Sequence, residues 1–282
     1  MAKSDPAPKT GSPALPITPD PGSMRGMAHL LSRIQRRGGS DPATLTEALG
    51  SGPWLCVAPH DDDVCLGMGL TVAAATAAGI EVHLGVVSDG AMGYPRPEDA
   101  ATIAATRHAE LIASSARLGI PAERVHELGL PDGELVAQRG VHRRADGRHT
   151  GVGRALAALL RRVRPRIVFG PNPADVHPDH QAVAADLDIA CFWAASAIWL
   201  ELGEPIALPT RWDYAVYAPF AGDPNLRLTG TPEGQRTKAA GFAAFASQQY
   251  VAEQLSTARP VEHLRRVTWQ AYEPSMYDRI FA

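Results

Sequence analysis

From residue 53 onward, short apolar runs alternate along the chain with longer segments of helical character. The apolar runs predict strands over residues 54–59, 80–88, 124–130 and 166–171. The intervening segments predict helices over residues 65–79, 97–119 and 151–165, with another helix beginning near Pro178. Strands separated by helices of this length are typical of parallel βαβ units. The pattern therefore predicts an α/β fold with a doubly wound, mostly parallel sheet in a three-layer α/β/α arrangement.

The two ends of the chain follow other patterns. Residues 1–22 are rich in Pro, Ser and Gly, so we expect a flexible tail there. Residues 27–37 have helix-like spacing, and a second short helix is expected after Asp41-Pro42. Further strands are predicted at residues 211–219 and 226–231, and a helix at residues 232–249. We expect a single domain over residues 23–282, preceded by the tail.

Polar segments directly follow the first four predicted strands. They are HDDD at residues 60–63, SDGAMGY at 88–94, LPDGEL at 130–135 and GPNPADVHPDH at 170–180. In an open parallel sheet, ligands bind beyond the carboxyl ends of the strands, where the chain order reverses. We therefore expect these four segments, which are distant in the sequence, to converge on one edge of the sheet and form the functional site.

The HDDD segment predicts a cation, because three adjacent carboxylates repel one another and are costly to bury alone. His60 and Asp63 can reach one ion from a tight turn, and His180 lies near the start of the helix after the fourth strand. Two imidazoles and one carboxylate are a typical ligand set for catalytic zinc, with one position left for water. The same set suits other divalent first-row metals. Asp62 then remains as a base that faces the water.

Each of these motifs also has a purely structural interpretation. An Asp-rich turn is often a solvated loop or a helix cap, and His177 before Pro178 is a typical start of a helix. The metal site is favoured when the motifs are taken together, because each directly follows a strand of the same predicted sheet.

Composition and charge narrow the class of protein. Of the 282 residues, 45% are hydrophobic, which is enough for a sizeable core. The net charge of −3 gives no basic field for nucleic acid or an anionic membrane, and we expect the basic runs at residues 161–166 and 263–267 at helix ends. Three cysteines do not indicate a disulfide framework, and no apolar run approaches the roughly 18 residues of a membrane helix. Without a recognisable secretory signal, a cytoplasmic protein is the expectation.

A family resemblance rests on several motifs in order. The stretch APHDDDVCLGMGLTVAAATAAGIEVHLGVVSDGAMGY resembles the LmbE-like or PIG-L-like zinc-dependent N-acetylglucosaminyl deacetylases, especially the branch with diacetylchitobiose deacetylases. The later segments TRHAELIASSARLGI, LGLPDGEL, HPDH and KAAGFAAFASQ also resemble family motifs. The resemblance covers about residues 52–270 and implies a Rossmann-like α/β fold.

The resemblance implies roles for the metal ligands and the base. His60, Asp63 and His180 would hold the zinc ion, which agrees with the set derived from the residues alone. Asp62 would be the general base toward the attacking water.

Four further residues acquire roles only through the resemblance. His177 would stabilise the oxyanion of a tetrahedral intermediate, and Asp179 would keep that imidazole charged and oriented. Arg107 and Asp132 would bind sugar hydroxyls.

Two positions depart from the family pattern. Asp61 replaces the usual proline, and its carboxylate either raises neighbouring pKa values or points into solvent. Phe245 stands where the late motif usually has a histidine, which puts the role of that segment in question.

The residues and the resemblance together predict metal-dependent hydrolysis of the acetamide of an N-acetylglucosamine-type sugar or glycoside. Two alternatives stay open: an amidase of the same fold that acts on another acyl group or a sugar–thiol conjugate, and a non-catalytic metal- or sugar-binding member. Dinucleotide binding is disfavoured, because GMGLTVAAA lacks the G-x-G-x-x-G pattern at the first strand end. The expected partner is a small amino-sugar or glycoside, with neither nucleic acid nor membrane, and a homo-oligomer is left open. Residues 136–151 are expected near the mouth of the site.

Overall fold

An eight-stranded mixed sheet forms the centre of the molecule. The computed structural model describes residues 30–254, 260–269 and 273–281. Across the sheet the strand order is β1-β9-β10-β8-β7-β2-β3-β4. The strands are β1 (Leu31–Arg36), β2 (Trp54–Ala58), β3 (Val82–Ser88), β4 (Val125–Leu130), β7 (Ile167–Pro171), β8 (Thr210–Tyr214), β9 (Leu226–Gly230) and β10 (Val261–Val267). From β8 to β4 the neighbours are parallel, and β10, β9 and β1 pair antiparallel beyond β8.

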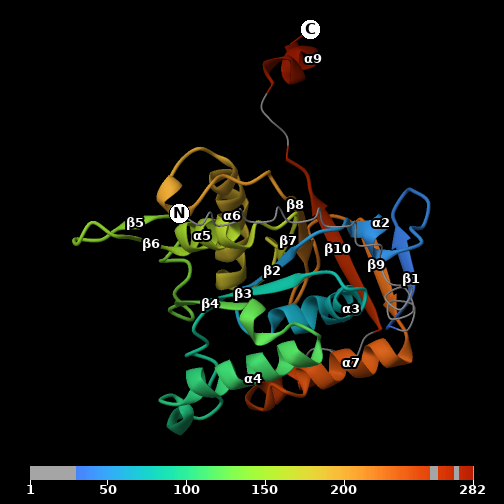
Figure 1. Cartoon of the computed structure of the whole chain (residues 1–282), viewed down its shortest axis with the longest axis vertical. Coiled ribbons are helices and arrows are strands. Elements are labelled where there is room, and N and C mark those ends of the chain that lie inside the picture. The colour runs from blue at the N-terminus through green and yellow to red at the C-terminus, as the bar shows by residue number, and fades with distance from the viewer. Residues whose placement is uncertain (1–29, 255–259, 270–272, 282) are drawn as a thin grey trace, which may run out of the picture.

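Helices cover both faces of this sheet (Figure 1). The helices of the described part are α2 (Leu45–Leu49), α3 (Asp63–Ala77), α4 (Ile103–Arg117), α5 (Val152–Val163), α6 (Pro178–Ala195), α7 (Pro232–Phe242), α8 (Gln249–Gln254) and α9 (Asp278–Phe281). The helices α3, α4 and α7 lie on one side of the sheet, and α5 and α6 lie on the other. A small separate hairpin pairs β5 (His142–Arg143) with β6 (His149–Thr150). The three-layer α/β/α arrangement predicted from the sequence is confirmed.

Strand β2 is buried along its whole length because both faces of the sheet are covered. Trp54, Cys56 and Ala58 pack in the core with α3 and α7, and Leu55 and Val57 pack in the core with α5 and α6. Such a strand has apolar residues at every position instead of alternating ones. The apolar run that predicts this strand is therefore explained by burial of both faces of the strand.

The predicted strands and helices of the alternating region are present, with small differences in their bounds. The helix predicted at residues 97–119 begins with a 3₁₀ turn at Pro97–Asp99 before α4. The strand predicted at residues 211–219 ends at Tyr214, and residues 215–219 form a loop instead. The helix predicted at residues 232–249 ends at Phe242, and a 3₁₀ turn follows.

The helix predicted at residues 27–37 is wrong where the structure describes it, because β1 occupies Leu31–Arg36. Leu31 and Ile34 are both buried, and a spacing of three residues is typical of a helix. The pairing of β1 with β9 shifts register between Leu31 and Arg33. An extra residue in a strand brings positions three apart onto one face, so the bulge imitates helical spacing.

The basic run at residues 263–267 was predicted at the end of a helix. This prediction is wrong, because the run lies in the strand β10. Glu262 and Leu264 alternate with more exposed neighbours, as in a half-buried strand. The run at residues 161–166 does lie at the end of α5, as predicted. The proposed tail, residues 1–22, lies outside the described residues, so the division of the chain into tail and domain stays a prediction. Among the described helices, none is long and apolar enough to cross a membrane.

Arg161 ties α5 to the end of α6. Its buried guanidinium donates hydrogen bonds to five backbone carbonyls, those of Trp193, Ala194, Ser196, Ile198 and Trp199. Carbonyls at the end of a helix lack intrahelical partners and carry partial negative charge. The planar, multiply donating guanidinium satisfies several of them at once.

We predict that Arg161→Lys lowers the free energy of unfolding by about 2–3 kcal/mol, because an ammonium group leaves some of these buried carbonyls unpaired. The adjacent, exposed Arg162 offers a matched control, and Arg162→Lys should change stability by less than about 0.5 kcal/mol. Denaturant titration of both variants and the wild type measures the difference. Equal losses in the two variants would contradict the role of Arg161.

Candidate metal centre

Three potential ligand atoms from three segments meet at the carboxyl end of β2. His60 lies just after β2, Asp63 is the first residue of α3, and His180 lies in the first turn of α6. Asp63 Oδ2 is 3.3 Å from His60 Nδ1 and 3.2 Å from His180 Nε2, and the two ring nitrogens are 3.3 Å apart. Tetrahedral zinc with bonds of about 2.0–2.1 Å separates its ligand atoms by about 3.4 Å. The three atoms therefore have the spacing of one face of a tetrahedral site.

The surroundings of these atoms also fit a cation. All three side chains are buried, and Asp63 Oδ1 has no hydrogen-bond partner within the described part of the chain. The second nitrogen of each imidazole faces a carboxylate. His180 Nδ1 lies 3.4 Å from Asp175 Oδ2, and His60 Nε2 lies 3.2 Å from Asp132 Oδ1. Carboxylates in this position orient ligand imidazoles and raise their basicity, so the donor set fits a divalent metal.

Two looser groups of ligands adjoin this one. Ligand atoms of His60, His177 and His180 lie within 4.8 Å of one another, as do those of His60, Asp132 and Asp179. The set containing Asp63 is more compact, with all three separations between 3.2 and 3.3 Å. The compact set is the better match to a single ion, and the looser groups place potential proton donors and acceptors around it.

The carboxylates of the site favour positive charge on both ligand imidazoles. Burial alone lowers the pKa of His60, but hydrogen bonds to aspartates, with Asp132 first, outweigh burial and hold that pKa well above its usual value. Burial also lowers the pKa of His180, yet Asp63 and Asp175 raise it to about 9. The pocket therefore stabilises positive charge at the two imidazoles, which protons or a metal ion can supply.

Asp62 lies between its two neighbouring aspartates and lines the cavity of the site. Burial is the largest cause of its pKa shift, and the charges of Asp63 and Asp61 add to it, so that the pKa of Asp62 rises to about 7. The guanidinium of Arg107, with Nη2 3.6 Å from Asp62 Oδ1, opposes this rise. A carboxyl group that titrates near neutral pH is suited to accept and return a proton.

Asp61 does not point into solvent, which was one of the two expectations for this position. Its buried carboxylate forms a two-point ion pair with Arg107, through a 2.8 Å bond from Nε to Oδ2 and a second bond from Nη2 to Oδ1. Arg107 comes from α4, so the pair connects the end of β2 to that helix. The guanidinium also packs against Gly93, where an added Cβ would collide with Nη1.

His177 is the N-cap of α6, and its Nδ1 accepts a hydrogen bond from the Asp179 backbone N–H at 3.2 Å. The Asp179 carboxylate accepts from the N–H groups of Gly133 and Leu135, at 2.9 and 3.1 Å, and lies 3.4 Å from His60 Nε2. Burial lowers the pKa of His177, and the neighbouring imidazoles add to this effect. The Asp179 backbone N–H thus orients the ring and burial favours its neutral form, and the charged form that the resemblance implies stays a prediction.

A cavity of about 210 Å³ opens beside the cluster. Its walls are His60, Asp62, Met92, Gly93, Arg107, Asp132, Gly133, His177, Tyr217, Gln248, Tyr250 and Val251. The four polar segments predicted to converge therefore do so, and a fifth segment after β8 joins them through Tyr217. The tyrosine ring lies 5.2 Å from His180 and 6.2 Å from His177, measured between ring centroids.

Asp175 and Tyr217 belong to the site although no sequence motif indicates them. Asp175 lies within the polar segment after β7, but only the structure shows that its carboxylate faces His180 and also accepts from the N–H groups of His177 and Tyr217. Tyr217 was assigned to a strand, so no site role was expected for it.

The late motif contributes through Ser247 and Gln248. Glu110 of α4 accepts hydrogen bonds from the backbone N–H and hydroxyl of Ser247, at 2.8 and 2.7 Å. Gln248 donates to the Gly93 carbonyl at 2.7 Å. Phe245, in place of the family's histidine, is fully buried in the core, so this position adds no polar group to the site.

Comparisons with known proteins agree with this architecture. Residues 55–190 match the family described as "PIG-L: GlcNAc-PI de-N-acetylase". A diacetylchitobiose deacetylase of Thermococcus kodakarensis is 32% identical over 45% of this chain and 44% of that protein. A 1D-myo-inositol 2-acetamido-2-deoxy-alpha-D-glucopyranoside deacetylase of Mycolicibacterium paratuberculosis is 33% identical over 45% of this chain and 47% of that protein. The chain thus spans about half the length of the curated relatives that it matches.

The fold is shared with solved structures. The crystal structure of a conserved protein from Thermus thermophilus superposes with a TM-score of 0.60 at 28% identity, and covers 78% of this chain and 97% of that chain. The superposition therefore covers more of the chain than residues 55–190.

We predict that the protein binds one zinc ion per chain and that His60→Ala and His180→Ala lower the bound metal at least tenfold, because each removes a ligand. Elemental analysis after dialysis measures the content. His108 is exposed and lies outside the site, so His108→Ala is the matched control and should keep full occupancy. Zinc retained in both ligand variants would contradict the assignment.

Proposed function

We propose, from the premise that residues 55–190 form a PIG-L family domain, that this protein is a metal-dependent N-deacetylase of N-acetylglucosamine-type sugars or glycosides. The observation that carries the proposal is the compact group of His60 Nδ1, Asp63 Oδ2 and His180 Nε2, with a carboxyl group of raised pKa beside it at the cavity. The relatives named above are deacetylases of acetamido sugars, which supports the same reaction here.

His60, Asp63 and His180 would hold the metal, with zinc the first choice and another divalent first-row ion also compatible with two nitrogens and one oxygen. When bound, such an ion lowers the pKa of water toward about 7 and polarises a carbonyl oxygen. The remaining chemistry falls to groups of the chain that line the cavity.

Asp62 is the proposed base. Its carboxylate takes a proton from water as the water attacks the acetamide carbon, and the resulting carboxyl group gives the proton to the departing sugar amine. The two transfers need one group that both accepts and releases a proton near neutral pH, and burial among carboxylates gives Asp62 that property. The products are acetate and the free amino sugar.

His177 is the proposed donor to the oxyanion. Because Nδ1 accepts from the Asp179 N–H, the proton of the neutral ring is on Nε2. A neutral imidazole with this tautomer donates one hydrogen bond without carrying charge, and burial, which lowers the pKa of His177, favours this neutral form. One such donor typically stabilises a transition state by roughly 3–4 kcal/mol. Asp179 then acts through its backbone N–H, and its carboxylate holds the loop at Gly133 and Leu135.

Arg107 and Asp132 are proposed to contact the sugar. Asp61 occupies Nε and Nη2 of Arg107, which leaves Nη1 beside Gly93 as the donor on the cavity wall. Asp132 accepts from the Met92 N–H at 3.0 Å and lines the same cavity, with capacity left for a hydroxyl donor. A cytoplasmic location stays a prediction, and the oligomeric state stays open.

The proposed function is tested by acetate release from a panel of N-acetylated sugars. The release is measured with the protein as isolated, after treatment with a chelator, and after zinc is added back. We expect acetate that disappears with the chelator and returns with metal. Asp62→Asn should keep the metal and lose about 10²–10⁴-fold in kcat, since it removes the base. Two results would overturn the proposal. One is that a protein holding one metal per chain releases acetate from none of the sugars, and the other is that Asp62→Asn keeps full activity.

The role of Arg107 predicts a change in substrate saturation. Arg107→Lys keeps a cation beside Asp61 but removes the Nη1 donor, so KM for the sugar should rise about tenfold, as for a lost charge-assisted hydrogen bond. Metal content should not change. Arg117→Lys, at an exposed position of the same helix, is the control and should leave KM unchanged. An unaltered KM in Arg107→Lys would contradict the contact.

A further inference from the structure

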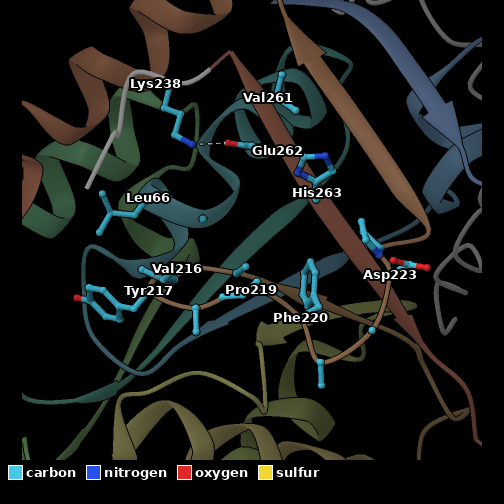
Figure 2. A pocket seen from close by; sticks show the side chains of 16 residues that line it. Leu66, Val216, Tyr217, Pro219, Phe220, Asp223, Lys238, Val261, Glu262 and His263 are labelled. Carbon is cyan, nitrogen blue, oxygen red and sulfur yellow. Dashed lines mark hydrogen bonds and ion pairs between the residues drawn. The ribbon is translucent and has the colours of Figure 1, made fainter. Parts of the chain in front are cut away.

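A second and larger cavity, of about 740 Å³, lies next to the site (Figure 2). Leu66 and Gly67 of α3, the loop at residues 215–224, Lys238 of α7 and residues 261–263 of β10 line it. In Figure 2, Leu66 and Tyr217 lie at one end of the cavity, and Phe220 and Asp223 lie toward the other. Its volume is within the range of about 300–1,000 Å³ that is typical of small-molecule sites, whereas the 210 Å³ cavity is below that range.

The two cavities share one wall residue and come close together at a second place. Tyr217 lines both of them. On the opposite element, Asp62 lines the small cavity and Leu66 lines the large one, and the Leu66 N–H bonds to the Asp62 carbonyl at 3.0 Å. Side chains four residues apart at the start of a helix are neighbours, with Cβ atoms about 5–6 Å apart. The large cavity therefore begins one helical turn from the proposed base.

Part of the wall of the large cavity is suited to an uncharged, apolar group, and His263 adds an imidazole to that wall. Val216, Tyr217, Phe220 and Val261 are only partly buried and present apolar surface to it. Such partly exposed aromatic and aliphatic side chains are typical of small-molecule sites.

The charged side chains in this wall already have partners. Lys238 Nζ is paired with Glu262 Oε1 at 2.7 Å. The Glu262 carboxylate also accepts from the backbone N–H groups of Leu70 and Thr71 and from the Thr71 hydroxyl. Asp223 pairs with Arg37. These pairings leave little unbalanced charge with which to attract an ionic ligand.

We propose that the large cavity is a subsite for the aglycone of the substrate, and that this aglycone is an uncharged group with an aromatic or alicyclic ring. The inference rests on the proposed function, because it takes the acetamido sugar to occupy the small cavity. Tyr217 then separates the two parts of one glycoside, with its ring facing His177 and His180 on the side of the reaction. The residues after β8 thereby select the substrate without taking part in proton transfer.

The test compares N-acetylglucosamine with its 2-naphthyl glycosides, in both anomers, as substrates of the zinc-loaded protein. We expect kcat/KM for one naphthyl anomer to exceed that for the free sugar about tenfold or more. Val261→Trp, which fills the cavity, and Phe220→Ala, which removes an aromatic wall, should each reduce this ratio at least fivefold. Leu208→Trp adds the same ring at an exposed position before β8, at the far end of that strand, and should leave the ratio unchanged.

The outcomes separate the subsite from the reaction. The subsite is overturned if acetate is released equally well from the sugar and the glycosides, or if a preference for the glycosides persists in both cavity variants. Either result is still consistent with the proposed deacetylase activity. If no substrate releases acetate, the proposed reaction is wrong. The subsite is then tested separately by calorimetric titration of the zinc-loaded protein with the sugar and the glycosides. Tighter binding of a naphthyl glycoside than of the free sugar, lost in Val261→Trp, supports it, and equal affinities overturn it.

Discussion

The burial of three consecutive aspartates is the constraint on which the site depends. Asp61 is compensated by a two-point ion pair with Arg107, and Asp63 lies between two imidazoles. Asp62 has no such partner, since Arg107 is 3.6 Å away and directed at Asp61. Burial raises the pKa of Asp61 even beside Arg107, and it raises the pKa of Asp62, with the charges of both neighbouring aspartates adding to it, to about 7. Three chemically identical side chains thus acquire different properties from the cations that the fold brings to each, and the least compensated one is the one suited to move a proton.

Local patterns predict the parallel half of the fold because its inner strands β2, β3 and β7 are almost wholly buried and its helices are long, although the edge strand β4 is partly exposed. β2 and β7 are apolar at every position, so burial on two sides is visible in the sequence itself. The antiparallel half is harder to predict from the sequence. In β1 a bulge gives Leu31 and Ile34 the spacing of a helix, and in β10 a buried Glu262 interrupts the apolar alternation. That carboxylate is acceptable inside because Lys238 and two N–H groups of α3 surround it, contacts that residues more than twenty positions away supply.

The site was predictable to the extent that its ligands follow strand ends. His60, Asp63 and His180 could be named because parallel strands deliver their carboxyl ends to one edge. The partner of Asp61 could not, since the pair with Arg107 joins residues 46 positions apart and depends on how α4 packs. The role of Tyr217 could not be predicted for a related reason. The pattern of residues 211–219 predicts a strand that continues past Tyr214, whereas the structure has a loop there, and this loop places Tyr217 in the wall of both cavities. Sequence motifs therefore predicted the cluster of His60, Asp63 and His180 better than the side chains that surround it.

The carboxylates around the ligands also explain how one pocket can accommodate both protons and a metal. The pKa of His60 is raised by Asp132, Asp179 and Asp63. The pKa of His180 is raised by Asp63 and Asp175. Two protonated imidazoles bring two positive charges to this pocket, and a divalent ion held by two neutral imidazoles brings the same number. Exchange of the protons for the ion therefore leaves the charge balance of the buried aspartates unchanged, although ligation requires the imidazoles to lose their protons.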